Sequence, residues 1–255
     1  MFGAVVGDIA GSTYERFNFK FESCEIFAEG SRFTDDTVLT LATADHFLFG
    51  ESYAEVYRRF GRNYPNAGYG ATFRQWMLAD DPKPYNSWAN GSAMRASPIA
   101  WVADDLEWAL EEAKRSAAVT HDHPNGIKGA QGVVAAVFLA RQGESKDAIR
   151  QLVGDRFGYN LDRTIEEIRP SYVFDVSCEG SVPEAIIAFL DSTDFESAIR
   201  KGISIGGDSD TIACIAGAIA HAFYGEVPQW MVEYCNGVLD VAQRSIMADF
   251  WERYM

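Results

Sequence analysis

Apolar residues recur along most of the chain at the spacing of an α-helix. The longest stripe has an apolar residue every three or four positions and comprises Ile212, Ile215, Ala216, Ile219, Ala220 and Phe223. Shorter stripes are formed by Tyr53, Val56, Tyr57 and Phe60, and by Val134, Val137 and Phe138. Further helices are predicted near residues 104–119, 145–157, 183–191, 194–202 and 228–254, with Pro183 and Pro228 at first-turn positions. The pattern predicts an all-α fold.

The segments between these stripes are short. Residues 61–70, 80–92 and 120–129 are rich in Gly, Pro and Asn and are predicted to be loops. Residues 171–176 fit a short strand, but the sequence offers no partner strand. Because no linker, repeat or low-complexity segment interrupts the chain, we expect a single compact domain, a multi-helix orthogonal bundle, over residues 1–255.

Composition and charge narrow the possible partners. Hydrophobic residues make up 47% of the chain, enough for a large core, and the formal net charge of -15 argues against binding to a nucleic-acid backbone. No apolar run reaches membrane length and no basic leader precedes Asp8, so neither a membrane partner nor a signal peptide is expected. Four widely spaced cysteines without a CxxC motif predict buried, reduced thiols in a cytoplasmic protein.

Two clusters of carboxylates and hydroxyls stand directly before helical stripes. The first is TDDT at residues 34–37 and the second is GGDSDT at residues 206–211. Helix capping explains one or two such side chains per helix, because Asp, Ser and Thr are preferred N-caps. Capping does not require adjacent carboxylates, whose like charges repel, nor two glycines before an Asp-x-Asp.

Convergence of these acids would require a cation. Asp208 and Asp210 would diverge on a regular helix, but Gly206 and Gly207 allow the chain to keep turning. Oxygen ligands with no His or Cys beside them favour Mg²⁺ or Mn²⁺ over Zn²⁺.

A third segment, residues 7–15, carries two more acids. Asp8 and Glu15 are seven residues apart, which would place them on one face of a helix. The apolar residues around Asp8 indicate a buried helix, in which an acid needs a partner.

Five motifs occur in order along the chain: GDIAGSTYE (7–15), FTDDT (33–37), NGSAMR (90–95), TH (120–121) and IGGDSDTIA (205–213). Together they resemble the ADP-ribosylglycohydrolase family, and the resemblance extends from residue 2 to about residue 225. It implies an all-α domain with two divalent metal ions, Mg²⁺ or Mn²⁺, in a central dinuclear cleft.

The resemblance also implies roles for individual residues. The family's metal ligands carry over onto Thr34, Asp35, Asp36, Asp208, Asp210 and Thr211. Its glutamate near the metals carries over onto Glu15 as a catalytic acid, base or gate, and Asp36 or Asp210 is a candidate to take a proton from water. Its substrate-binding residues carry over onto Asn90, Gly91, Ser92 and His121.

The implied activity is hydrolysis of the bond between C1″ of the distal ribose and an acceptor. The substrate would be an ADP-ribosylated protein or a small molecule that contains ADP-ribose, and the metals would orient the ribose and acidify a water. Alternatives are a protein that binds ADP-ribose or a nucleotide without turnover, a crystallin-like structural member, or a hydrolase of another ribosyl compound. The sequence leaves the acceptor open.

Other polar residues allow two interpretations each. His121 and His123 fit a zinc site, although two histidines are few ligands, or ligand contact and capping. Arg95 fits phosphate binding or a buried ion pair. Tyr85 and Trp88 fit stacking on adenine or ordinary packing. The core is expected to hold Cys178 and Cys214, and solvated helix faces are expected to hold Glu111, Glu112, Glu166 and Glu167.

Overall fold

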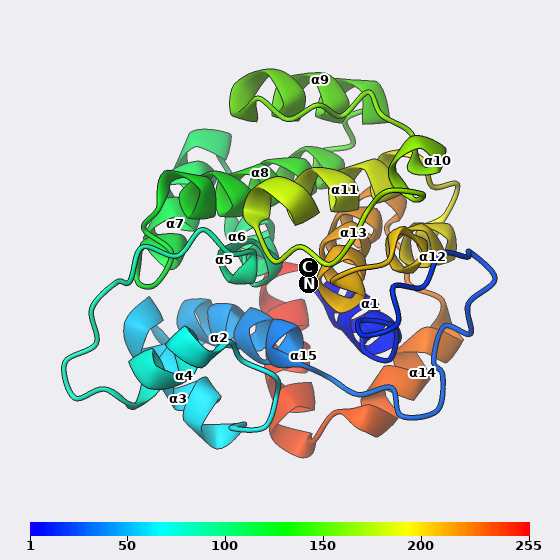
Figure 1. Ribbon diagram of the computed structural model, residues 1–255. Helices are drawn as coiled ribbons and strands as arrows, with labels where there is room; N and C mark the ends of the chain where they lie inside the picture. The colour runs from blue at the N-terminus through cyan, green and yellow to red at the C-terminus, as the bar shows by residue number, and fades with distance from the viewer.

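Helix α13 (Ser209–Tyr224) lies at the centre of the structure and packs along its length against α1 (Phe2–Gly11) (Figure 1). The computed structural model describes residues 1–255. Glycine permits the close approach of the two helices: a Cβ atom on Gly7 would lie 2.0 Å from the carbonyl oxygen of Ala213. Every residue of α13 from Ser209 to His221 is buried, so side chains at its start are held deep in the molecule.

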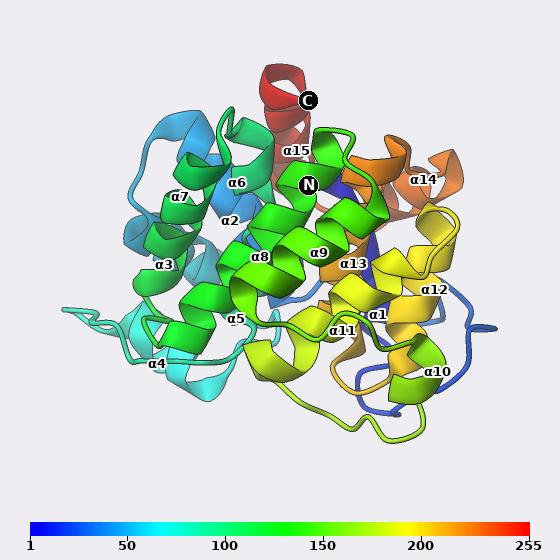
Figure 2. The ribbon, with the colours of Figure 1, turned by 90° about the horizontal axis from the view of Figure 1, so that it is seen from above.

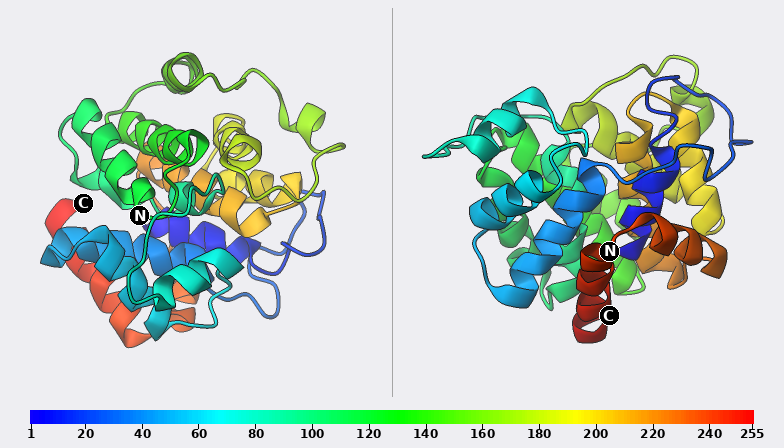
Figure 3. Two further views of the ribbon diagram at one scale, coloured as in Figure 1. Left: turned by 60° about the vertical axis from the view of Figure 1, so that its left-hand side comes forward. Right: turned by 90° about the horizontal axis from the view of Figure 1, so that it is seen from below.

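The remaining helices surround this pair. They are α2 (Asp35–Phe49), α3 (Tyr53–Asn63), α4 (Ala71–Leu78), α5 (Gly91–Met94), α6 (Ser97–Val102), α7 (Leu106–Ala118), α8 (Pro124–Arg141), α9 (Lys146–Phe157), α10 (Ile165–Ile168), α11 (Cys178–Leu190), α12 (Phe195–Ile205), α14 (Gln229–Val238) and α15 (Val241–Tyr254). Helix α8 runs between α7 and α11 (Figure 2). At the C-terminus, α14 packs on α1 and α15 on α2 (Figure 3).

The all-α prediction is confirmed, because the chain contains no strand. Ala89 and Ser177 form the one isolated β-bridge. The strand considered at residues 171–176 is absent; this segment is an irregular connection. Its backbone instead bonds to the loop before α5, since Asn90 N donates to the carbonyl oxygen of Val176.

Three helix boundaries differ from the sequence prediction. Pro183 lies inside α11, which begins five residues earlier, where the Ser177 hydroxyl accepts a hydrogen bond from Gly180 N. The stretch 228–254 forms two helices rather than one. The first ends before Asp240, and Asp240 caps α15 through a capping box with Gln243. Helix α8 begins at Pro124, within the predicted loop 120–129, and His123 caps it.

The buried apolar side chains form one continuous core. All four cysteines lie in it as free thiols, as predicted. Glu112 was wrongly placed on a solvated face: it is buried and pairs with His46 at 3.8 Å and with Arg115 at 3.3 Å, whereas Glu111 is exposed. None of the helices combines the length and the apolar character that a membrane crossing needs.

The contact between α1 and α13 predicts a strong effect of a single methyl group. We expect Gly7→Ala to lower the free energy of unfolding by about 2–3 kcal/mol, because the new Cβ overlaps backbone that cannot move away. The matched control is Gly237→Ala on exposed α14, where nothing lies within 4 Å and a gain of about 0.5–1 kcal/mol is expected. Urea unfolding of both variants measures the difference, and equal stabilities would contradict this account of the packing.

Candidate active site

A cleft of about 630 Å³ opens where α2 and α13 begin. Both acidic clusters line it, although about 170 residues separate them in the sequence; its wall includes Glu15, Asp35, Asp36, Asp208, Asp210 and Thr211. A second hollow of about 590 Å³ lies beside α12 and is lined by Arg200, four acids and four other residues. Of these two hollows, the first brings together the acids that the sequence singled out.

The carboxylates in the cleft converge. Glu15, Asp208 and Asp210 each offer an oxygen, and these oxygens lie within 4.8 Å of one another. Asp36 Oδ2 and Asp210 Oδ1 are buried without any hydrogen-bond partner. Asp208 is the N-cap residue of α13, yet its side chain makes no capping bond. Capping therefore does not explain why this acid stands here.

Burial and mutual repulsion raise the pKa values of these acids. Burial, followed by the charge of Asp8, raises the pKa of Asp35 to about 7. Burial likewise raises the pKa of Asp208 to about 6 against an opposing hydrogen bond from Asn90, and lifts those of Asp36 and Asp210 well above the ordinary value. Such a cluster is costly unless cations neutralise it, and its hard oxygen donors suit Mg²⁺ or Mn²⁺.

Asp8 lies beneath the first acidic cluster and fixes its geometry. Its carboxylate accepts four hydrogen bonds: from the backbone N–H of Thr34 at 2.9 Å, from that of Thr37 at 3.0 Å, and from both threonine hydroxyls. Because Thr34 Oγ1 gives its proton to Asp8, its lone pairs remain for Asp36 N, 3.2 Å away, and for a ligand. Asp8 thus orients the start of α2.

Glu15 does not share a helix face with Asp8, contrary to the prediction. Helix α1 ends at Gly11, and Glu15 is half-buried in the turns that follow. A Cβ on Gly11 would lie 2.5 Å from the Cα of Asp210, so the end of α1 lies directly against the start of α13. The turns bring Glu15 back over the second acidic cluster.

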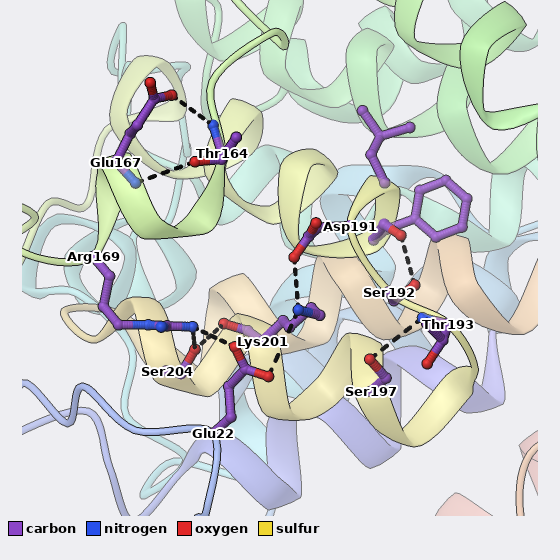
Figure 4. A network of polar contacts seen from close by, with 12 residues as sticks. Glu22, Thr164, Glu167, Arg169, Asp191, Ser192, Thr193, Ser197, Lys201 and Ser204 are labelled. Carbon is purple, nitrogen blue, oxygen red and sulfur yellow. Dashed lines mark hydrogen bonds and ion pairs between the residues drawn. The ribbon is translucent and has the colours of Figure 1, made fainter.

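The loop that carries Glu15 is tied to the second cluster. Asn18 Oδ1 accepts a hydrogen bond from Gly207 N at 3.0 Å, and Lys20 Nζ donates to the carbonyl oxygens of Tyr172 and Ile205 at 2.6 Å each. Further along the loop, Glu22 lies between Arg169 and Lys201, at 2.6 and 3.6 Å (Figure 4). Glu15 is therefore held by contacts on a loop rather than by a helix.

The loop before α5 forms the opposite wall. The Asn90 side chain donates to Asp208 Oδ2 at 2.6 Å and to Ser181 Oγ at 3.1 Å. Gly91 lines the cleft beside the imidazole of His121. Ser92 behaves differently, because its side chain is fully buried and its hydroxyl donates to the carbonyl oxygen of Gly126. The structure thus places Asn90, Gly91 and His121 on the cleft, with the Ser92 hydroxyl behind it.

The two histidines of the TH motif region do not form a zinc site. The imidazole of His123 accepts from Asn125 N at the start of α8, whereas His121 faces the cleft. Arg95 is fully buried and forms no ion pair; it donates to Ser116 O and Thr120 Oγ1. Tyr85 and the half-exposed Trp88 line the cleft.

Sequence reasoning missed several residues of the cleft wall. Arg16 and Arg32 line it next to the motifs, and their side chains have no partner in the protein. Phe174 and Val176 also line it, from the segment considered as a strand. Nothing in the local sequence pattern signals these positions, because the loops that carry them have no periodicity.

Fold and site together define a class of protein. It is an all-α protein in which the N-termini of two central helices bring carboxylates and hydroxyls from distant segments into one cleft. The model of the ADP-ribosylglycohydrolase family matches residues 1–254. The chain belongs to this family.

Individual relatives agree with this assignment. ADP-ribosylhydrolase ARH3 of Mus musculus is 29% identical over 98% of this chain and 90% of its own, and the Homo sapiens protein is 30% identical over 92% and 87%. ADP-ribosylarginine hydrolase Tri1 of Pseudomonas putida (strain GB-1) is 26% identical over 91% of this chain and 72% of its own. A solved ADP-ribosylglycohydrolase-related protein complex shares the fold, with a TM-score of 0.78, 20% identity, and coverage of 100% of this chain and 96% of that one.

The four hydrogen bonds to Asp8 predict a large loss of stability on neutralisation. In Asp8→Asn, an amide group would face the N–H groups of Thr34 and Thr37. We therefore expect the free energy of unfolding to fall by about 3 kcal/mol. Asp122→Asn is the matched control, because this carboxylate accepts one bond from exposed Asn86; its effect should stay below about 1 kcal/mol. Similar urea midpoints for the two variants would show that Asp8 does not organise the start of α2.

The raised pKa values predict how pH acts on metal-free protein. Folded Asp35 and Asp208 release their protons near pH 7 and 6, whereas their ordinary pKa is 3.8. The folded state therefore binds more protons than the unfolded state in this window, and stability falls as pH rises through 6 to 7. We expect a lower melting temperature at pH 8 than at pH 5.5 in EDTA, and recovery at pH 8 on adding Mg²⁺ or Mn²⁺. A melting temperature at pH 8 that stays the same when either ion is added would refute the prediction.

Proposed function

We propose that this chain is a metal-dependent hydrolase that cleaves the C1″ glycosidic bond of ADP-ribosylated protein or of a small molecule containing ADP-ribose. The observation that carries the proposal is the convergence of Glu15, Asp208 and Asp210 with the unpartnered buried oxygens of Asp36 and Asp210. Membership of a family whose relatives are named ADP-ribosylhydrolases supports it. The active unit is one domain that spans residues 1–255.

The ligand set for two divalent ions consists of carboxylates and hydroxyls from the two helix starts. It comprises Thr34, Asp35, Asp36, Asp208, Asp210 and Thr211. The fit rests on the raised pKa values and the orphaned oxygens, because both are relieved by a cation. Divalent ions held by these residues would supply positive charge toward the ribose hydroxyls and would lower the pKa of a bound water.

The protein's own side chains divide the remaining tasks. Asp36 or Asp210, besides holding a metal ion, is the candidate to accept a proton from the attacking water. Glu15, half-buried on its tethered loop, is the candidate to protonate the leaving group or to close over the bound sugar. Asn90, fixed to Asp208, and His121, on the same wall, hold the diphosphate side of the substrate.

The decisive test is a release assay on a panel of substrates. Purified protein is incubated with peptides ADP-ribosylated on arginine or serine and with O-acetyl-ADP-ribose, in Mg²⁺, Mn²⁺ or EDTA, and free ADP-ribose is quantified. We expect metal-dependent release from at least one substrate. Asp36→Asn and Asp210→Asn should each reduce the rate by about 100-fold or more, because a proton acceptor is lost. Asp147→Asn, on exposed α9, is the control and should retain the wild-type rate.

The same assay separates the alternatives. Binding of ADP-ribose without release from any substrate would favour a binding protein. Absence of Mg²⁺ and Mn²⁺ binding in calorimetry, together with an intact fold, would favour a structural role.

A further inference from the structure

Arg95 is a buried cation without a counter-ion. Its side chain is fully buried and no carboxylate lies within 4 Å, although the chain carries 37 acidic residues. One nitrogen, Nη2, donates to Ser116 O at 2.9 Å and to Thr120 Oγ1 at 2.8 Å, and the guanidinium stacks over Tyr57 at 4.1 Å. Nε and Nη1 are unpartnered. A buried charge held this way needs an explanation beyond packing.

Arg95 itself borders the cleft, and Thr120 connects its guanidinium to His121, which also lines the cleft. Thr120 Oγ1 lies 2.7 Å from Nδ1 of His121 and accepts the hydrogen bond from Arg95. Oγ1 has one proton and two lone pairs, and the bond from Arg95 uses one lone pair, so the hydroxyl can donate to Nδ1 or accept from it. The charge of Arg95 favours donation to Nδ1, because a lone pair on Nδ1 directed toward a cation is more stable than an N–H directed toward it.

The other ring nitrogen of His121 faces the cleft. A Cβ on Gly91 would lie 3.1 Å from Nε2, and this nitrogen has no hydrogen-bond partner in the protein. With Nδ1 unprotonated, Nε2 must carry the proton of the neutral ring. Burial and the Arg95 charge both lower the pKa of the imidazolium, so the ring stays neutral at physiological pH.

We propose that Arg95 and Thr120 are positioning residues that fix His121 as a neutral Nε2–H donor directed at a substrate oxygen that only accepts, such as a phosphate oxygen. The chain runs from the Arg95 guanidinium through the Thr120 hydroxyl to the His121 imidazole. The Nε2–H donor favours a ligand that places an acceptor oxygen, rather than an amine, at this point of the cleft. The proposal rests on the proposed function for the identity of the ligand, but not for the tautomer.

The tautomer is measured directly in the full chain without ligand. Nitrogen-15 NMR of histidine-labelled protein distinguishes the two neutral tautomers, and His121→Asn assigns the signals among the four histidines. We expect wild type to show Nε2–H at residue 121. Thr120→Val should give a mixture of tautomers, whereas Thr120→Ser, which keeps the hydroxyl, should restore Nε2–H. Tyr85→Phe removes the other hydroxyl beside Thr120 and should leave the tautomer unchanged.

Calorimetry with ADP-ribose supplies the second measurement. Thr120→Val should weaken binding about tenfold, the loss of one aligned hydrogen bond, and Thr120→Ser should bind as wild type does. An Nδ1–H tautomer in wild type, or an unchanged tautomer in folded Thr120→Val, would overturn the inference. If wild type binds no ADP-ribose, the proposed function fails while the NMR result still decides the role of Arg95 and Thr120.

Discussion

The close contact between α1 and α13 is the constraint on which the rest of the structure depends. Glycines at positions 3, 7 and 11 repeat at the spacing of one helix face, and each lies against α13, the last against Asp210. A methyl group at any of them would overlap backbone atoms of α13. Because the helices meet this closely, Asp8 on α1 reaches the start of α2 while Asp210 on α13 lies at the end of α1. One packing contact therefore brings both acidic clusters to the same place.

This arrangement concentrates negative charge where the fold offers only partial compensation. The N-termini of α2 and α13 carry the positive ends of two helix dipoles, and Asn90 donates to Asp208. These contributions leave Asp36 and Asp210 with unpartnered buried oxygens and raised pKa values. Burial raises the pKa of Asp8 as well, but four donors satisfy its carboxylate. The site thus has an inner acid whose hydrogen bonds are satisfied and outer acids whose charge a bound cation would neutralise.

The sequence predicted the helical class and the two acidic clusters because both follow from local patterns. The 212–223 stripe and the TDDT and GGDSDT motifs are visible without any tertiary knowledge. It failed where tertiary contacts override local signals: Pro183 is tolerated inside α11, Glu112 is buried against His46, and Glu15 leaves the helix after Gly11. The sequence reasoning also missed the spacing of Gly3, Gly7 and Gly11, a local pattern that the close contact with α13 explains.

The cleft wall has two kinds of parts, the starts of buried helices and irregular loops. The acids stand on the starts of two buried helices, so their geometry follows from the core. The rest of the wall comes from irregular loops, including Arg16 and Arg32 beside Glu15 and Phe174 beside Gly207. Loop residues can change without disturbing the α1–α13 contact, whereas the acids cannot. Under the proposed function, acceptor specificity should therefore be sought on these loops, and the bond-breaking chemistry at the two helix starts.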